Sequence, residues 1–346
     1  MSTFPRYRAA ARMIAAIGVL SLAAACAGNG GGGGTSGATA DGGSGGYPDQ
    51  NITFVVPFSA GGPTDTVTRM IAEPMAAKLG AKIVVQNVEG AGGTVGAGEV
   101  ARAQPDGYTV LMHHIGMSTA PALYQDPGYK PLESFEMVGL VTEVPMTIVA
   151  RKDFEPATLQ DLVTYVKANA DKVTLANAGI GAASHLCGLL FQTATGVKVQ
   201  EVPYEGTGPA LTDLVGGQVD FMCDQTTNTS GQISAGEVKA YAVTTPERVK
   251  SLPDLPTTTE AGLPDLKVSV WHGLYVPKGT PQDAVEKLSE ALKTALADQK
   301  VIDQMAKLGT APVPAEDATP QAHRAKLEEQ LTTWGKVISD AGIKAS

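Results

Sequence analysis

At 346 residues the chain is about twice the length of a typical domain, which predicts two domains or one large one. Apolar residues make up 43% and charged residues 18%, a globular composition with ample material for a core. The net charge of -9 argues against a nucleic acid or an anionic surface bound through bulk charge, because like charges repel. An anionic ligand would have to be held by local dipoles.

The N-terminal segment is predicted to be an export signal. Arginines precede an apolar run over residues 13–25 that ends in "SLAAAC" at Cys26. The run is shorter than the roughly 20 residues that a membrane-spanning helix needs. Cysteine after alanines resembles a bacterial lipobox, although Leu22 lies one place early. We therefore expect residues 1–25 to be a lipoprotein signal peptide and Cys26 to be lipidated, which anchors the protein to the cell membrane outside the cytoplasm. An ordinary secreted protein with a chance cysteine is the alternative.

The next segment and the remaining cysteines fit an exported protein. Residues 26–46 are rich in Gly and Ser, which predicts a flexible tether with the folded part beginning at about Tyr47. Cys187 and Cys223 remain after Cys26. Outside the cytoplasm two cysteines are more often paired than free, and two separately buried thiols are the alternative.

The folded part alternates strand patterns with helix patterns, which predicts an α/β fold with mainly parallel sheets covered on both faces. Helix starts are signalled by Thr158 with Asp161, and by Thr280 with Pro281 and Asp283; the chain after Pro281 is predicted to be helical only. The expected strands are Ile52–Phe58, Lys82–Val88, Tyr108–His114, Met137–Val149, Val173–Ala176, Lys198–Pro203, Val219–Cys223, Lys239–Val243 and Val268–Val276.

Two long extended segments, over residues 136–154 and 266–279, are candidates for strands that cross between lobes. They predict a discontinuous first lobe of residues 47–146 plus 270–346 and an inserted second lobe of residues 147–269. Ligands in such folds lie between the lobes, at the carboxyl ends of strands. The hinge is expected near Val144–Thr147 and Trp271–Gly273.

The stretch "VVPFSAGGPTD" over residues 55–65 predicts an anion-binding turn. It runs from a strand into a helix, with Gly62 as the expected N-cap, Pro63 at the first helical position and Asp65 at the third. Backbone N–H groups and the positive end of the helix then face out at the strand tip. A plain tight turn, in which Asp65 only satisfies its own helix, is the alternative. Similar glycine-rich junctions that could face the same cleft lie at residues 87–98, 175–191 and 202–221.

Enzymatic and cofactor sites are not favoured. "GIGAAS" nearly fits a dinucleotide fingerprint, but Ser184 replaces the third glycine and nicotinamide cofactors are scarce outside the cell. Ser184 and His185 are neighbours on a helix and point to different faces, which excludes a nucleophile–base pair. His113 and His114 alternate on a strand, so at most one reaches a cleft, where His114 could donate to a ligand carboxylate or remain a scaffold side chain. Without metal-ligand spacing or a catalytic constellation, we expect a binding protein with no metal and no cofactor.

Several segments, in the same order from about Ile52 to the C-terminus, resemble the solute-binding proteins of tripartite tricarboxylate transporters, also called Bug receptors. They are "VPFSAGGPTDTVTRMIAEPM", "VVQNVEGAGGTVGA", "DGYTVLM", "PALY", "GAASHLCGLLF", "VPYEGTGPALTDLVGGQVDFMCDQ" and "LPTTTEAGLPDLKVSVWHGLYVPKGTP". The resemblance implies two α/β lobes of the periplasmic-binding-protein type, joined by crossing strands and closing like a clamshell on a small carboxylate. It also implies delivery of that ligand to membrane permease subunits driven by an ion gradient. We expect a monomer with no nucleic-acid partner.

The resemblance further implies a set of ligand-binding residues. They hold the ligand carboxylate through backbone N–H groups, hydroxyls and bridging waters, with little use of Arg or Lys. The matching positions are Phe58, Ser59, Gly61, Gly62, Thr64, Asp65, Gly92, His114, Ser118, Ala182, Ala183, Ser184, Tyr204, Thr207 and Asp224. The segments "SHLCG" and "MCDQ" look like a subgroup feature that favours a disulfide between Cys187 and Cys223.

The ligand class depends on the role of Asp65. Its charge would repel a second ligand carboxylate but could pair with a ligand amino group, whereas a purely capping Asp65 fits a dicarboxylate without an amine. We expect a C4–C6 dicarboxylate or an acidic amino acid, with citrate and aromatic carboxylates next. The alternatives are a ligand-sensing lipoprotein of a signalling system, an exported enzyme and a structural surface lipoprotein.

Overall fold

A computed structural model describes residues 46–340 and residue 342, within a compact unit formed by Gly45–Ser346. The predicted signal peptide of residues 1–25, the predicted lipidation of Cys26 and the tether up to residue 45 lie outside the described residues. None of the helices in residues 46–340 combines the length and the apolar character that crossing a membrane requires.

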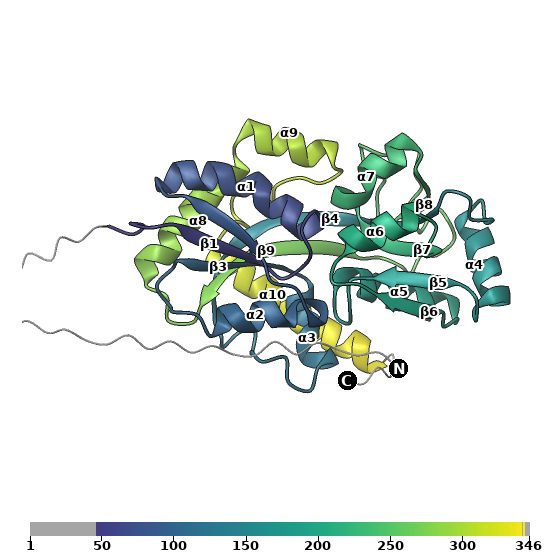
Figure 1. The fold of residues 1–346 in the computed structure, drawn as a ribbon, viewed down its shortest axis with the longest axis horizontal. Coiled ribbons are helices and arrows are strands. Elements are labelled where there is room, and N and C mark those ends of the chain that lie inside the picture. The colour runs from purple at the N-terminus through teal and green to yellow at the C-terminus, as the bar shows by residue number, and fades with distance from the viewer. Residues whose placement is uncertain (1–45, 341, 343–346) are drawn as a thin grey trace, which may run out of the picture. The chain divides into compact units, whose positions relative to one another are not determined.

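The strands of the described residues form one sheet in the order β2-β1-β3-β9-β4-β7-β5-β6, with β8 paired to β4 (Figure 1). Each strand expected from the sequence is confirmed, with small differences at the ends. The strands are β1 (Ile52–Val56), β2 (Ile83–Asn87), β3 (Thr109–His114), β4 (Phe135–Arg151), β5 (Thr174–Asn177), β6 (Gln200–Pro203), β7 (Phe221–Gln225), β8 (Val238–Val243) and β9 (Ser269–Pro277).

The expectation of mainly parallel sheets is wrong. β1 pairs in parallel with β2 and β3, and β5 with β6 and β7, but β9 is antiparallel to β3 and β4, and β4 is antiparallel to β7 and β8. The alternation of strands and helices predicts parallel neighbours only where one strand feeds the next through a helix. β4 and β9 instead find partners far away in the sequence.

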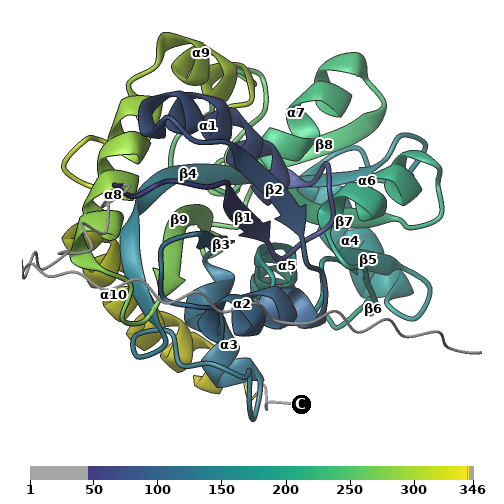
Figure 2. The ribbon, with the colours of Figure 1, turned by 60° about the vertical axis from the view of Figure 1, so that its left-hand side comes forward.

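Strand β4 links two halves of the sheet. Its residues Phe135–Pro145 pair with β9, and its residues Met146–Ala150 pair with β7. We call β1, β2, β3, β9 and the first part of β4 the first sheet half, and the remaining strands the second sheet half. The β4–β9 register shifts at two places, and such irregularities bend a strand. Figure 2 shows β4 curving as it passes from one half to the other.

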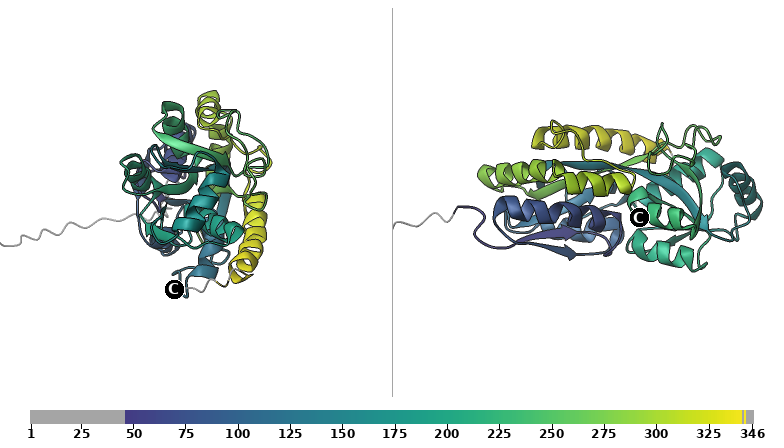
Figure 3. Two further views of the ribbon diagram at one scale, coloured as in Figure 1. Left: turned by 90° about the vertical axis from the view of Figure 1, so that its right-hand side faces the viewer. Right: turned by 90° about the horizontal axis from the view of Figure 1, so that it is seen from above.

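Helices cover both faces of each half (Figures 1 and 3). α10 packs against α3 and β4 and lies at the outside of the unit in both views of Figure 3. The helices are α1 (Pro63–Leu79), α2 (Thr94–Ala101), α3 (Gly116–Leu123), α4 (Leu159–Asn169), α5 (Ala183–Thr195), α6 (Thr207–Val215), α7 (Thr226–Ala235), α8 (Gln282–Leu296), α9 (Gln299–Lys307) and α10 (Pro320–Asp340), with the short 3-10 helix η1 (Ala91–Gly93) before α2.

The core follows the alternation of side chains along the strands. In β1, Phe54 and Val56 join a buried cluster with Ile71 of α1 and Leu292 of α8, whereas Val55 joins the cluster on the other face. Successive residues of a strand point to opposite faces, which explains this division. Burying a side chain of this size contributes about 1.5–3 kcal/mol, so both helical layers are held to the sheet by apolar contacts.

Local signals predict the start of α4 correctly and miss the start of α8 by one residue. Thr158 and Asp161 form the expected capping box at the start of α4. Thr280 does not cap α8, because its hydroxyl donates to the Pro277 carbonyl oxygen and the helix begins at Gln282.

In the second half, a disulfide joins Cys187 of α5 to Cys223 of β7, with 5.9 Å between the two Cα atoms.

Candidate ligand-binding site

Helices α1, α5, α6 and α7 begin at one region between the two sheet halves. Each follows the carboxyl end of a strand, and their N-cap residues are Gly62, Ala182, Gly206 and Gln225. None of these residues caps its helix through a side-chain hydrogen bond. Since the first-turn N–H groups and the helix dipoles all point there, this region has a positive potential without basic side chains.

The β1–α1 turn shows how the sequence builds one of these helix starts. Gly61 adopts a φ of 77°, a conformation that L side chains rarely adopt. The Gly62 N–H donates to the Ser59 carbonyl oxygen at 3.3 Å, and Pro63 follows as the first helical residue. Proline suits that position because its missing N–H would have no partner inside the helix. The N-cap, first and third helical positions expected from the motif are confirmed.

A small enclosed cavity lies where these helices begin. Its volume is about 10 Å³, close to the minimum that one water molecule needs. A dicarboxylate can therefore enter only after the walls have separated. The lining residues are Phe58, Gly62, Pro63, Thr64, His114, Ala178, Ala182, Ala183, Ser184, Thr207, Asp224 and Gln225.

Most of the residues expected to bind ligand are in this wall, but some lie elsewhere. Ser118 donates its hydroxyl proton to the Ile115 carbonyl oxygen at 2.6 Å, within its own helix turn. The Tyr204 hydroxyl donates to Asp213 at 2.8 Å in the second half. The expected residues outside the wall are Ser59, Gly61, Asp65, Gly92, Ser118 and Tyr204.

The wall also contains Pro63, Ala178 and Gln225, which were not among the expected ligand-binding residues. Pro63 and Gln225 sit at helix starts, and Ala178 directly follows β5. Their position at the carboxyl end of a strand is the signal that could have found them. Ala178 is apolar and has no feature in its own chemistry that points to a ligand.

Ser59 and Gly92 lie where the two halves touch. The Ser59 N–H donates to the Glu205 carbonyl oxygen at 3.1 Å. A Cβ on Gly92 would come within 1.9 Å of the Ile180 carbonyl oxygen, so only glycine fits there. The Tyr124 hydroxyl lies 2.7 Å from the same Ile180 oxygen, in the second half, and 2.8 Å from the carbonyl oxygen of Ala91, in the first half. These contacts hold the loops of the two halves together.

Asp65 is buried, and its carboxylate is fully engaged outside the cavity wall. Its Oδ2 atom accepts bonds from the Arg69 Nε and the Gly61 N–H, both at 2.9 Å, and its Oδ1 atom accepts one from the Asn87 amide at 3.1 Å. Burial alone would raise the pKa of Asp65, but these bonds outweigh it and hold the pKa below its usual value. This geometry favours the role of anchoring the turn over that of pairing with a ligand amine.

Histidines gather in the first-half wall. His114 lines the cavity and stacks on Phe58 with 4.5 Å between ring centroids, and His113 and His272 pack beside it. Burial lowers the pKa of His113 to about 4 and of His272 to about 3, and burial with the neighbouring rings holds the pKa of His114 well below its usual range. The His114 Nδ1 atom accepts the Gly116 N–H at 3.0 Å, so the neutral ring carries its proton on Nε2, as a donor. In residues 46–340 no cluster of His, Cys, Asp and Glu is arranged to hold a metal ion.

Asp224 is the only carboxylate among the residues that line the cavity. It lies on β7 and is fully buried. Its Oδ1 atom accepts the Gln225 N–H at 2.8 Å, and its Oδ2 atom accepts from the Asn228 amide. Burial raises the pKa of Asp224 to about 6, even though the bonds from Asn228, Gln225 and Thr207 favour the charged form.

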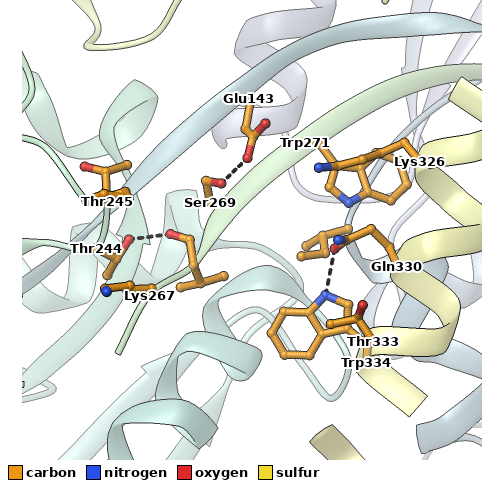
Figure 4. Close-up of a pocket in the computed structure, with 13 residues that line it drawn as sticks. Glu143, Thr244, Thr245, Lys267, Ser269, Trp271, Lys326, Gln330, Thr333 and Trp334 are labelled. Atoms are coloured by element: carbon orange, nitrogen blue, oxygen red, sulfur yellow. Dashed lines mark hydrogen bonds between the residues drawn. The ribbon is translucent and has the colours of Figure 1, made fainter. Parts of the chain in front are cut away.

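A second, more open pocket of about 290 Å³ lies beside the crossing strands and contains none of the expected ligand-binding residues. Figure 4 shows its walls, which come from β4, β9, α10 and the segments around Thr244 and Lys267. Glu143 accepts a bond from Ser269, and the Trp334 indole N–H donates to Gln330 at 3.0 Å. This pocket lacks the helix starts that give the enclosed cavity its potential.

Comparison with known proteins identifies relatives along most of the chain. Residues 67–343 match the family model described as tripartite tricarboxylate transporter family receptor. The chain is 55% identical, over 296 residues and 86% of each chain, to a UPF0065 protein from the TAR-I ttuE–ttuC' intergenic region of Agrobacterium vitis. It is 32% identical over 316 residues to Protein BugT of Bordetella pertussis, which covers 90% of this chain and 95% of that one.

Solved structures of proteins with similar sequences have the same fold as this chain. The periplasmic binding protein BugD has a TM-score of 0.85 and 53% identity, covering 87% of this chain and 100% of its own. MatC of Rhodopseudomonas palustris with bound malate has a TM-score of 0.83 and 41% identity, covering 84% and 100%. Rpa4515 of R. palustris with adipate has a TM-score of 0.82 and 31% identity, covering 87% and 100%. The two-lobed α/β periplasmic-binding-protein fold that the family resemblance implies is confirmed.

Proposed function

Because the chain belongs to the tripartite tricarboxylate transporter family of solute-binding receptors, we propose that it captures a small carboxylate between its sheet halves and delivers it to membrane permease subunits. The family acts outside the cytoplasm. In this proposal residues 47–146 and 270–346 form one lobe, residues 147–269 form the other, and a lipid on Cys26 anchors the receptor to the membrane.

The observation that carries the proposal is the convergence of four helix starts on one cavity. The N-termini of α1, α5, α6 and α7 meet there without side-chain caps. The cavity wall contains no Lys or Arg. Uncapped N–H groups at a helix start bind anions directly, and dipoles from several helices add. A carboxylate is the small anion that fits such a site in this family.

Relatives and strand pairing support two further parts of the proposal. MatC was solved with malate and Rpa4515 with adipate, both dicarboxylates. In this chain the partner of β4 changes between Pro145 and Met146, which fits a hinge at the expected place. Since the enclosed cavity holds about one water molecule, ligand entry requires opening, and the bound ligand then stabilises the closed form through contacts with both halves.

A thermal-shift screen tests the binding step. The purified protein, refolded to remove copurified ligand, is melted with succinate, malate, aspartate, glutamate, citrate, adipate, terephthalate and nicotinate, and with neutral sugars as controls. Ligand at 100 times its Kd adds about 2.7 kcal/mol to the free energy of unfolding, so carboxylates of the right shape raise the Tm. A flat carboxylate panel combined with a shift by a sugar would contradict the proposal.

A matched pair of variants tests the site itself. Thr207→Val removes a hydroxyl from the cavity wall and is expected to weaken carboxylate binding by about fivefold to tenfold, the value of one hydrogen bond. Thr212 lies on the exposed side of the same helix, where its hydroxyl donates to the Gly208 carbonyl oxygen. The control variant Thr212→Val is therefore expected to leave the affinity unchanged.

Delivery is tested by uptake of labelled ligand into cells that express the permease subunits with and without the receptor.

A further inference from the structure

The open pocket of about 290 Å³ in Figure 4, which we call the hinge pocket, lies on the face of the crossing strands opposite the ligand cavity. His272 of β9 reaches toward the cavity wall, with 3.4 Å between its Nε2 atom and the hydroxyl oxygen of Thr64. Trp271 is the neighbour of His272 on β9 and lines the hinge pocket. Since successive residues of a strand point to opposite faces, the crossing strands separate the hinge pocket from the cavity.

The walls of the hinge pocket come from both sheet halves. One wall contains Lys326 and Trp334 of α10, a helix that packs against β4 and against α3, which follows β3 of the first half. The other wall contains Thr244, which follows β8 of the second half, and Lys267, which precedes β9. Figure 4 shows these two walls on either side of Glu143 and the crossing strands. The width of the hinge pocket therefore depends on the angle between the two halves.

The side chains of the hinge pocket offer hydrogen-bond donors and positive charge. Lys267 and Lys326 form no ion pair within the part of the chain that the structure describes. The Trp271 indole N–H is buried and has no acceptor among the described residues. The side-chain oxygen of Gln330 accepts the Trp334 indole N–H at 3.0 Å, which leaves the Gln330 amide nitrogen available as a donor. Donors that lack acceptors indicate a site for an anion.

Charge, surface and size together define the class of ligand. Glu143 is the one carboxylate among the lining residues and accepts a bond from Ser269, so two lysines against one carboxylate leave a net positive charge. Apolar surface comes from the two indole rings and from Ile115, Pro246 and Val268. The volume is close to the lower bound of about 300 Å³ for small-molecule sites. An organic anion with one flat ring and one acidic group matches these properties.

We propose that the hinge pocket is a second ligand site, which binds a small aromatic anion, and that its occupant stabilises the closed receptor. The acidic group of the anion accepts bonds from the lysines, the Gln330 amide and the Trp271 indole, and the ring packs against the apolar wall. Binding in the hinge pocket does not depend on the proposed function. Its effect on carboxylate affinity does rest on that function.

The direction of the effect follows from the position of the hinge. The two halves turn about the crossing strands, so a movement that separates them at the cavity brings them together on the opposite face. In the closed structure the cavity is reduced to about 10 Å³, whereas the hinge pocket measures about 290 Å³. A molecule that fills the hinge pocket therefore resists opening. By linkage, the anion and the carboxylate in the cavity raise each other's affinity by the same factor.

Intrinsic fluorescence measures binding in the hinge pocket directly, because both tryptophans of the chain line it. The protein, with its cavity saturated by the best carboxylate of the thermal-shift panel, is titrated with benzenesulfonate and with the neutral control benzenesulfonamide. We expect a saturable change of emission with benzenesulfonate and none with the control. In calorimetric titration, benzenesulfonate is expected to raise the affinity for the carboxylate by about fivefold or more.

A matched pair of lysine variants on α10 tests the position of the site. Lys326→Gln removes a cation from the hinge pocket and is expected to weaken benzenesulfonate binding by about fivefold or more. Lys336 lies outside the pocket on the same helix, where its ammonium group donates to Asp340 at 2.6 Å. Lys336→Gln removes the same charge from the protein and is expected to leave benzenesulfonate binding unchanged.

Each other outcome overturns a stated part of the proposal. An equal response to benzenesulfonate and benzenesulfonamide, or an equal loss in both lysine variants, overturns the anion site. Benzenesulfonate that binds without changing carboxylate affinity overturns the effect on closure, and a lowered carboxylate affinity shows that it competes in the cavity instead. If no carboxylate of the panel binds, the proposed function fails and the effect on closure with it. The fluorescence titration of the ligand-free protein then still decides whether the hinge pocket binds an anion.

Discussion

A Cβ placed on Gly206 would lie 1.9 Å from the hydroxyl oxygen of Ser59 and 2.9 Å from its backbone nitrogen. Ser59 belongs to the loop after β1 in the first half, and Gly206 is the N-cap of α6 in the second half. The two loops therefore meet backbone to backbone beside the ligand cavity. Any side chain at position 206 must push them apart.

Gly206→Ala is expected to shift the protein toward an open conformation. The added methyl overlaps the Ser59 backbone, and rotating the hydroxyl alone does not relieve the contact. Overpacking of this kind costs about 1–3 kcal/mol, so carboxylate affinity should fall by about tenfold or more while the two halves stay folded. Small-angle scattering of the ligand-free protein would show a larger radius of gyration.

Gly231→Ala is the matched control for that change. Gly231 lies inside α7, and an added Cβ meets nothing within 4 Å. Alanine there should raise the free energy of unfolding by about 0.5–1 kcal/mol through helix propensity and leave affinity unchanged. Equal affinity in both glycine variants would show that contact between Gly206 and Ser59 does not control closure.

Tyr124→Phe should weaken closure more gently. The lost hydroxyl lies within hydrogen-bonding distance of the Ala91 and Ile180 carbonyl oxygens, one in each half. One hydrogen bond contributes about 0.5–1.5 kcal/mol, which predicts a twofold to roughly tenfold loss of carboxylate affinity with little change in Tm. The measurement is calorimetric titration with the best ligand of the thermal-shift panel. A loss of Tm without a loss of affinity would place Tyr124 in fold stability only.

Removal of the disulfide should destabilise the second half. Cys187 and Cys223 are 36 residues apart in sequence, and closing a loop of that size stabilises the folded protein by about 2–4 kcal/mol. Urea unfolding of the Cys187→Ala, Cys223→Ala double variant should show a loss of that size, and a reducing agent should lower the midpoint of the unchanged protein alone. Unfolding curves that a reducing agent leaves unaltered would indicate that the pair is not bonded in solution.

Acid should destabilise the protein from about pH 6 downward. Burial lowers the pKa of His113, His114, His185, His272 and His323, so below about pH 6.5 the unfolded chain binds protons that the folded protein does not. Each such histidine costs about 1.4 kcal/mol per pH unit until its folded pKa is reached. Asp224 acts in the opposite direction, because its raised pKa lets the folded protein take up a proton first.

The net expectation is a loss of up to about 5 kcal/mol per pH unit between about pH 6 and about pH 4.5. Urea unfolding at a series of pH values measures this slope. A free energy of unfolding that stays level across the range would mean that these histidines are not held neutral in the folded protein.

Features that depend on neighbouring residues were predictable from the chain alone. The strands, the start of α1 at Pro63 and the capping box of Thr158 follow from local periodicity and turn chemistry. The order of the glycine-rich loops was specific enough to identify the family. The strands and helix starts arise from residues within about ten positions of one another, where steric and hydrogen-bonding rules act directly.

Other features depended on contacts between residues far apart in the sequence. The antiparallel pairing of β4 with β9 brings together segments more than a hundred residues apart, and no local pattern encodes its direction. The same holds for the roles of the two buried aspartates: Asp65 is engaged by Arg69 and Asn87, whereas Asp224 faces the cavity without a cation. Asp65 lies in the first turn of α1 and Asp224 lies on β7, and only the donors that folding places around the Asp65 carboxylate show that it anchors its turn.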